Sequence, residues 1–356
     1  MVAILTDITY SDSLWSQSMS LNLMEQLRAK RIPFCEISDS CPAQCDTVFI
    51  IASDLEWTRN AVRQLNASGR SPIVLLGHQY ETLQGCIYSC VCSDVNSSMR
   101  NLLKMLDLRG KRQLAIYGLN PASISDVSRT NSLFSWRDPE TGPTAVFINE
   151  GSLQQCFDSF FPEARKFDAV ICTNDFAAIS LVRNLAVRSP ELLNKLTVVS
   201  CAETNLSNYY RRYISTIHVN FDQIGHAAVY IYESLRKRPY LSSMTLNVAW
   251  SFQEERPTQA LAETPLVLNR TVDTFYQDPE LQEMLTVDKL LNSVDPVDRQ
   301  ILEGLSQEKT YDEIAELCFL SEGSIKYRIK RMLGQSNASS REEIVRLLKK
   351  YTINVP

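Results

Sequence analysis

Three observations predict an α/β protein with two doubly wound parallel-sheet lobes, followed by a small all-α helix-turn-helix domain. Short β-branched runs alternate with longer helical patterns from residue 2 to about residue 248. The alternation repeats about nine times, which gives more strands than one small sheet needs. Near residue 250 it stops, and a region of capped helical patterns follows.

Strands and helices are expected to alternate along the first part of the chain. A strand that is followed by a helix and then by another strand belongs to a parallel sheet with helices on both faces. We predict strands at 2–6, 34–37, 47–52, 73–76, 113–117, 144–148, 169–173, 197–200 and 215–219. We predict helices at 13–30, 57–66, 96–108, 123–136, 175–188 and 222–237.

Changes in this pattern divide the 356 residues into three parts. A chain of this length exceeds what one hydrophobic core usually serves. We expect a two-lobed domain over 1–250, a linker and connecting helix over 251–293, and a helix-turn-helix domain over 294–356. Pro257 and Pro265 interrupt any regular period in the linker.

Composition narrows the class of protein. Hydrophobic residues make up 44% and charged residues 22%, as in an ordinary globular chain. The net charge of -5 argues against a uniformly basic nucleic-acid binder, so local charge must decide. No signal-peptide pattern and no run of about 18 apolar residues is present, so we expect a cytoplasmic protein without a membrane partner. There the ten cysteines should be reduced thiols.

The C-terminal region carries the strongest local signals. Asp295 and the proline after it are typical of a helix start. Thr310 and Glu313 form the spacing of a capping box and open a second short helix. Residues 318–320 then form a turn, and Ser321 caps a third helix.

The polar face of that third helix is basic. From residue 321 to residue 333 there are four basic residues and one acidic residue. A helix of this kind fits the major groove, where Lys and Arg reach guanine edges or phosphates. We therefore predict double-stranded DNA as a partner, contacted by Ser324, Lys326, Tyr327, Arg328, Lys330 and Arg331.

This region resembles the LuxR-type helix-turn-helix over about 60 residues. The likeness rests on residues 311–326 and on the Ser-Ser-Arg-Glu-Glu sequence at 339–343. It implies that the third helix reads DNA and that a helix from Arg341 to Tyr351 completes a four-helix domain often used for dimerisation. A small helical bundle with a merely solvated basic face is the alternative.

The first 250 residues resemble the effector-binding core of LacI-type repressors, which has the type I periplasmic-binding-protein-like fold. The clearest segment is 169–178, where an Asn-Asp pair ends a strand and opens a helix. The resemblance implies a transcription regulator that senses a small molecule, expected to be a sugar or sugar derivative, in the cleft between its lobes. The ligand contacts that it implies are Tyr10, Trp15, Asp94, Arg129 and Asn174.

Each of these residues also has a structural interpretation. Asp94 can cap the helix that follows it, Arg129 can lie solvated on a helix, and Trp15 can belong to the core. Asp175 fits a cap that fixes its loop better than it fits a ligand contact.

The sequence departs from the LacI-type pattern in three ways. Ala202 stands where an acidic residue commonly anchors the sugar, and Val219 stands where a polar residue often lies. A less hydroxylated or more apolar effector than a standard hexose becomes credible. The DNA-binding region follows the sensor instead of preceding it, so we expect effector-driven lobe closure to change the spacing of C-terminal domains in a homodimer.

Two other classes of regulator remain open. A phosphorylation-controlled response regulator also ends in this type of helix-turn-helix, and Asp7 and Asp54 follow the first and third strands. Receivers need an acidic pair after the first strand, however, and Asp7 stands alone. The other class is a cytosolic ligand receptor whose C-terminal bundle binds protein.

We expect no enzymatic activity, no cofactor and no metal. The chain has three histidines and lacks the HExxH, GxSxG and glycine-rich phosphate-binding patterns. Cys86, Cys90 and Cys92 fall at even spacing, so on a strand they would share one face. A buried thiol cluster explains them better than a metal site.

Overall fold

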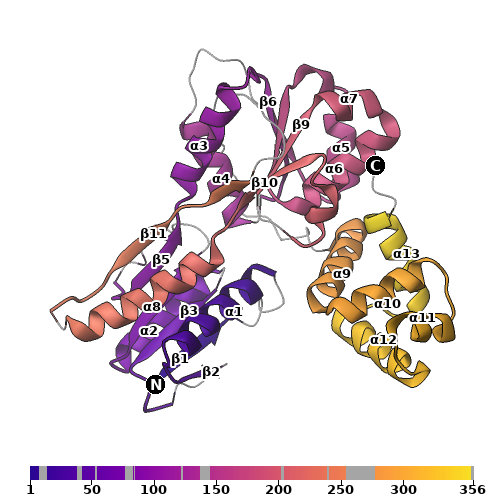
Figure 1. The fold of residues 1–356 in the computed structure, drawn as a ribbon. Coiled ribbons are helices and arrows are strands. Elements are labelled where there is room, and N and C mark those ends of the chain that lie inside the picture. Colours follow the sequence, from indigo (N-terminus) through magenta and orange to yellow (C-terminus); the bar gives the residue numbers. More distant parts are fainter. Residues whose placement is uncertain are drawn as a thin grey trace. The chain divides into compact units, whose positions relative to one another are not determined.

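The chain folds into two compact units in a computed structural model (Figure 1). The first unit contains Met1–Asn101 and His218–Phe252, and the second contains Leu102–Ile217 and Gln253–Pro356. The structure describes residues 1–7, 14–37, 42–52, 54–76, 83, 85–121, 123–136, 145–201, 204–238, 240–253 and 277–353.

The first unit is built on a six-stranded parallel sheet with helices on both faces. Alternate apolar residues of each strand point to opposite faces, so both faces need cover. Helices α1 and α8 pack on one face and α2 packs on the other. The sheet order is β11-β5-β4-β3-β1-β2. The bounds are β1 Val2–Thr6, β2 Phe34–Ile37, β3 Thr47–Ile51, β4 Ser71–Leu76, β5 Ser89–Ser93, β11 Thr245–Val248, α1 Leu14–Ala29, α2 Leu55–Ala67, α3 Val95–Asp107 and α8 Phe221–Lys237.

A second six-stranded sheet forms the α/β part of the second unit. Its order is β12-β10-β9-β8-β6-β7, and the pairs from β10 to β7 are parallel. The helix α6 begins directly after β8, which brings its N-terminus to the carboxyl edge of the sheet. The bounds are β6 Leu114–Leu119, β7 Ala145–Ile148, β8 Ala169–Cys172, β9 Thr197–Cys201, β10 Ile214–His218, β12 Ser251–Gln253, α4 Ile124–Ser135, α5 Leu153–Phe160, α6 Asp175–Arg188, α7 Pro190–Lys195, η2 Ala164–Lys166 and η3 Ser207–Tyr210.

Five more helices follow in the second unit, drawn from orange to yellow in Figure 1. All three predicted N-terminal caps are present. Asp295 with Asp298 and Thr310 with Glu313 form complete capping boxes, and Ser321 caps α12. The turn after α11 is made by Phe319, whose φ of 54° lies in the left-handed region. The bounds are α9 Pro279–Ser293, α10 Pro296–Ser306, α11 Tyr311–Cys318, α12 Glu322–Ser336, α13 Arg341–Leu348 and a π-helical turn η5 Lys349–Ile353.

The predicted fold class is confirmed. Each predicted strand and each of the six predicted helices of residues 1–250 has a counterpart whose bounds differ by two residues at most within the described residues. Strands β5, β11 and β12 and helices α5 and α7 were not among the predicted elements. The predicted domain limits near 250 and 293 remain a prediction. Within the described parts of the chain, no helix combines the length and the apolar character that a membrane span requires.

Gly118 allows close packing between β6 and α6 in the second unit. Its φ is +75°, and the pairing of β6 with β7 shifts register between Tyr117 and Leu119. A Cβ at this position would lie 2.4 Å from the Cβ of Ala177 on α6. Only glycine meets both conditions without strain.

We expect Gly118→Ala to lower the free energy of unfolding by more than about 2 kcal/mol, because the methyl group adds a clash to a left-handed backbone. Gly334→Ala is the matched control, since a Cβ at this position of α12 would meet no atom within 4 Å. There alanine should be neutral or stabilising by up to about 1 kcal/mol. Urea unfolding followed by circular dichroism measures both, and equal midpoints would contradict this packing.

Candidate functional site

Arg129 lies at the carboxyl edge of the second unit's sheet. Its guanidinium donates to the carbonyl oxygen of Thr173 at 2.8 Å and to Asp126 Oδ1 at 3.1 Å. Thr173 directly follows β8, and only 13% of the Arg129 side chain is exposed. Arg129 is therefore not a solvated helix residue, because two partners orient it across the strand end.

Asp126 is the partner that the sequence did not reveal. Its carboxyl is buried, and burial raises the pKa of Asp126 although Arg129 opposes the shift. The backbone N–H of Asn120 also lies 3.4 Å from Asp126 Oδ2. Asp126 positions the guanidinium of Arg129 three residues along α4. An acidic residue three positions before an arginine was the available signal, but exposed helix pairs share it.

Asn174 follows Thr173, whose carbonyl oxygen accepts a hydrogen bond from Arg129, and it caps α6. Its Oδ1 accepts the backbone N–H of Ala177 at 3.0 Å, and its Nδ2 lies 3.4 Å from Thr173 Oγ1. Its neighbour Asp175 is buried and accepts hydrogen bonds from Ser200 Oγ and from the backbone N–H of Thr204. Asp175 thus fixes the chain after β9. It is the first residue of α6 and not the predicted cap, because Asn174 caps the helix.

The other predicted ligand residues belong to the first unit. Asp94 caps α3, because its Oδ1 accepts the backbone N–H of Ser97 at 3.0 Å. Trp15 is half-buried and packs against the core between the sheet and α1 and α8. Val219 packs against the same core. Tyr10 and Ala202 lie outside the described residues. Of the predicted set, Arg129 and Asn174 both lie in the second unit, and each contacts Thr173.

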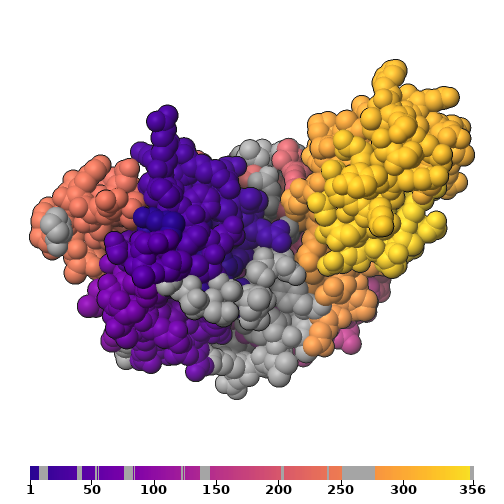
Figure 2. Space-filling model, turned by 90° about the horizontal axis from the view of Figure 1, so that it is seen from below, coloured from indigo at the N-terminus to yellow at the C-terminus, as the bar shows by residue number. Residues whose placement is uncertain are grey.

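The second predicted interface is the outer face of α12. Tyr327 is 69% exposed, and Lys330 is exposed one turn further along the helix. Lys326 pairs with Glu322 at 2.6 Å, and its Nζ lies 5.6 Å from the ring centroid of Tyr311. Ser324 donates its backbone N–H to the capping hydroxyl of Ser321. Figure 2 shows the yellow residues of these helices open to solvent on the face drawn.

Two arginines of the predicted face turn toward α10 instead. Arg328 Nη1 lies 2.7 Å from Asp298 Oδ1 and 2.8 Å from Asp295 Oδ2. Arg331 contacts Asp298 as well, and the Asp298 side chain has no exposed surface. The hydrogen bond from Arg328 holds the pKa of Asp295 at about 2. These arginines join α12 to α10, a role that the sequence pattern did not indicate.

Two alternatives from the sequence, a response-regulator aspartate at Asp54 and a metal site at three cysteines, can be compared with the structure. Asp54 caps α2, because its Oδ1 accepts the backbone N–H of Trp57 at 2.6 Å. Cys90 and Cys92 lie on one face of β5 with their sulfur atoms 3.6 Å apart, and Cys86 packs against the same core. Among the residues that the structure describes, no group of three His, Cys, Asp or Glu side chains could hold a metal ion.

Comparison with known proteins supports the fold. No protein-family model and no curated protein matches the chain. A LacI family transcriptional regulator from Enterococcus faecium with bound ribose is 17% identical with a TM-score of 0.54, covering 75% of this chain and 100% of that one. A LacI family regulator from Arthrobacter sp. FB24 in complex with lactose is 14% identical with a TM-score of 0.56, covering 72% and 98%.

A third similar structure is a dimeric Lac repressor. It is 13% identical with a TM-score of 0.55, covering 73% of this chain and 99% of that chain. The two parallel-sheet α/β parts of the chain therefore have a LacI-like, periplasmic-binding-protein-like fold, and additional C-terminal helices are present. About a quarter of this chain lies outside each match.

Asp298→Ala should destabilise the C-terminal helices by about 3 kcal/mol, because it leaves Arg328 and Arg331 without their shared buried carboxylate. Glu316→Ala removes an exposed carboxylate on α11 and should change stability by less than about 0.5 kcal/mol. Thermal unfolding followed by circular dichroism compares the two variants. Equal melting temperatures would show that the arginine pair does not hold α12 to α10.

Proposed function

We propose that this protein is a ligand-responsive, DNA-binding transcription regulator and not an enzyme. The single observation that carries the proposal is one unit in which a LacI-like strand edge, with Arg129 and Asn174, is joined to a capped helix with an exposed basic face. The proposed effector is a small polar molecule, a sugar or sugar derivative. The proposed DNA partner is a duplex, bound by a homodimer in the cytoplasm.

The chemistry of the strand edge supports a hydroxylated effector. An arginine presents a fixed fork of donors, and an asparagine amide both donates and accepts. Arg129 is held by Asp126 and Thr173, so little conformational entropy is lost when it binds a ligand oxygen. Asp175 is engaged by Ser200 and Thr204, which argues for an effector with fewer hydroxyl contacts than a standard hexose.

The C-terminal helices support a DNA-binding role. Ser321 caps α12 after a turn at Phe319, the arrangement that the LuxR-type likeness implies for a reading helix. Lys326, Tyr327 and Lys330 form its exposed face and are the proposed base and phosphate contacts. Arg328 and Arg331 also remain proposed contacts, through the part of each side chain that is exposed.

One feature favours a second candidate function, a receptor whose C-terminal bundle binds protein. Phe319 is 95% exposed and Leu317 is 54% exposed at the turn before α12. Exposed apolar and aromatic residues are typical of protein-binding surfaces, and Tyr327 on α12 is exposed as well. Binding to a partner protein with no salt-dependent duplex binding would favour this candidate.

Lys330→Ala should weaken binding to every duplex sequence alike and lower the slope of log affinity against log salt by about one, because one phosphate contact is lost. Lys166→Ala is the control, since it removes an exposed lysine from the sheet part of the same unit. Fluorescence anisotropy with a labelled duplex at several salt concentrations gives both slopes. An unchanged slope for Lys330→Ala would exclude this lysine from the interface.

A screen of sugars and sugar derivatives by thermal shift tests the sensor. A ligand present at ~100 times its dissociation constant should stabilise the protein by ~2.7 kcal/mol. Arg129→Met should abolish the shift, whereas Arg188→Met, which removes an exposed arginine of α6, should retain it. A sugar that stabilises the parent and the Arg129 variant equally would place the binding site elsewhere.

A further inference from the structure

The start of α9 is fastened to the sheet part of the second unit. Asp278 is buried, and its Oδ2 accepts the backbone N–H of Leu153 at 2.7 Å, so it caps the first turn of α5. Two residues later, Glu280 accepts a hydrogen bond from Ser180 Oγ on α6 at 2.8 Å. Burial raises the pKa of Glu280 although Ser180 opposes the shift. On a helix at the protein surface these carboxyl groups would be hydrated. Here they are bonded to α5 and α6 instead.

A second attachment lies three turns further along α9. Asp288 has no exposed surface, and its Oδ1 accepts the backbone N–H of Leu206 at 2.8 Å. Asn292 donates to Asp288 Oδ2 at 3.0 Å and accepts a hydrogen bond from Asn205. Burial raises the pKa of Asp288 to about 6. A buried carboxyl group is costly unless it is bonded, so this contact specifies one position of the helix.

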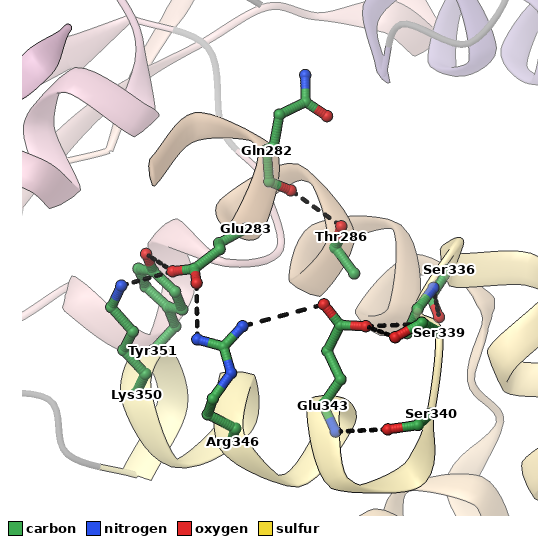
Figure 3. A network of polar contacts seen from close by, with 11 residues as sticks. Gln282, Glu283, Thr286, Ser336, Ser339, Ser340, Glu343, Arg346, Lys350 and Tyr351 are labelled. Atoms are coloured by element: carbon green, nitrogen blue, oxygen red, sulfur yellow. Dashed lines mark hydrogen bonds and ion pairs between the residues drawn. The ribbon is translucent and has the colours of Figure 1, made fainter. Parts of the chain in front are cut away.

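The opposite face of α9 belongs to the C-terminal helices. Leu290 lies in their hydrophobic core. Glu283 accepts hydrogen bonds from Arg346 at 2.7 Å, from Tyr351 Oη at 2.9 Å and from Lys350, as Figure 3 shows. These three donors outweigh the effect of burial and lower the pKa of Glu283 to about 2. One helix therefore serves two cores.

The end of the described chain makes a further attachment to α6. Arg183 donates to the backbone carbonyl of Lys350, and its guanidinium carbon lies 4.8 Å from the ring centroid of Tyr351. Tyr351 is fully buried, so this cation–π contact is shielded from water. The C-terminal helices are thus held at both of their ends, by α9 and by η5.

A short segment, residues 204–210, links the strand edge to α9. Asp175, the neighbour of Asn174, accepts the backbone N–H of Thr204 at the start of this segment. Ser207 donates its backbone N–H to Thr204 Oγ1 at 3.2 Å and its hydroxyl to the Thr204 carbonyl at 2.8 Å. Asp288 holds Leu206, which lies between them. The segment is therefore fastened to the strand edge on one side and to α9 on the other.

We propose that α9 is a shared helix that locks the C-terminal helices to the sheet of the second unit, so that residues 204–210 and α12 move as one body. The consequence of this lock for regulation rests on the proposed function. If an effector displaces the strand edge at Asn174 and Asp175, it also displaces α12, the proposed DNA-reading helix. Asp278 and Asp288 are positioning residues in this arrangement. If the C-terminal helices were instead tethered flexibly, α12 would move independently of residues 204–210.

Pulsed electron paramagnetic resonance on the full chain tests the lock. Spin labels are introduced as non-canonical amino acids at Val187, which is 85% exposed on α6, and at Glu316, which is exposed on α11. We expect one narrow distance distribution. The double variant Asp278→Ala, Asp288→Ala should broaden it, and Asp158→Asn, which alters an exposed carboxylate of α5, should leave it narrow.

Hydrogen exchange on the single variant Asp288→Ala covers the case in which the double variant unfolds. If α9 is released as a unit, the peptides that contain Leu206 and Leu153 should both exchange at least about tenfold faster. Faster exchange at Leu206 alone would overturn the proposal, as would a broad distance distribution in the parent chain or one that the double variant leaves unchanged. Neither measurement contains DNA or an effector, so a chain that fails to bind DNA can still give the expected results.

Discussion

Buried carboxylates that accept backbone N–H groups hold the second unit in one arrangement. Asp175 fixes Thr204, Asp278 fixes Leu153, and Asp288 fixes Leu206. Removing each carboxyl group from water costs free energy, and the hydrogen bonds that it accepts in the folded chain offset this cost. Apolar packing alone would tolerate small shifts, whereas these directional contacts define where α9 sits. The candidate ligand edge, the connecting helix and the C-terminal helices depend on that placement.

On α12, the proposed reading helix, some charged residues stabilise the fold and others are proposed to bind DNA. Asp298 takes up Arg328 and Arg331 at the contact of α12 with α10. Lys326 and Lys330 remain on the outer face with Tyr327 between them. A chain with a net charge of -5 can therefore present a local cationic surface on one helix. The arginines give the helix its orientation. The lysines are the residues that we propose attract DNA phosphates.

Local signals predicted the fold and the starts of the C-terminal helices, because periodicity and capping act over a few residues. The cap at Asp295 and the capping box at Thr310 are signals of this kind. The partner of Arg129 was missed, since Asp126 three residues earlier has the spacing of an ordinary surface pair. The role of α9 could not be predicted, because Asp278 contacts a residue 125 positions away. No periodicity encodes a contact of that range.

We propose a two-lobed sensor whose second unit carries α12 as a fixed DNA-reading helix. The most direct test is a selection from a randomised duplex pool with the full chain, run in parallel with the double variant Lys326→Ala, Lys330→Ala. The parent chain should enrich a defined sequence, arranged as two related half-sites if it binds as a homodimer. The double variant should not enrich it. A parent chain that enriches no sequence, or a variant that enriches the same sequence equally well, would contradict the proposed role of α12.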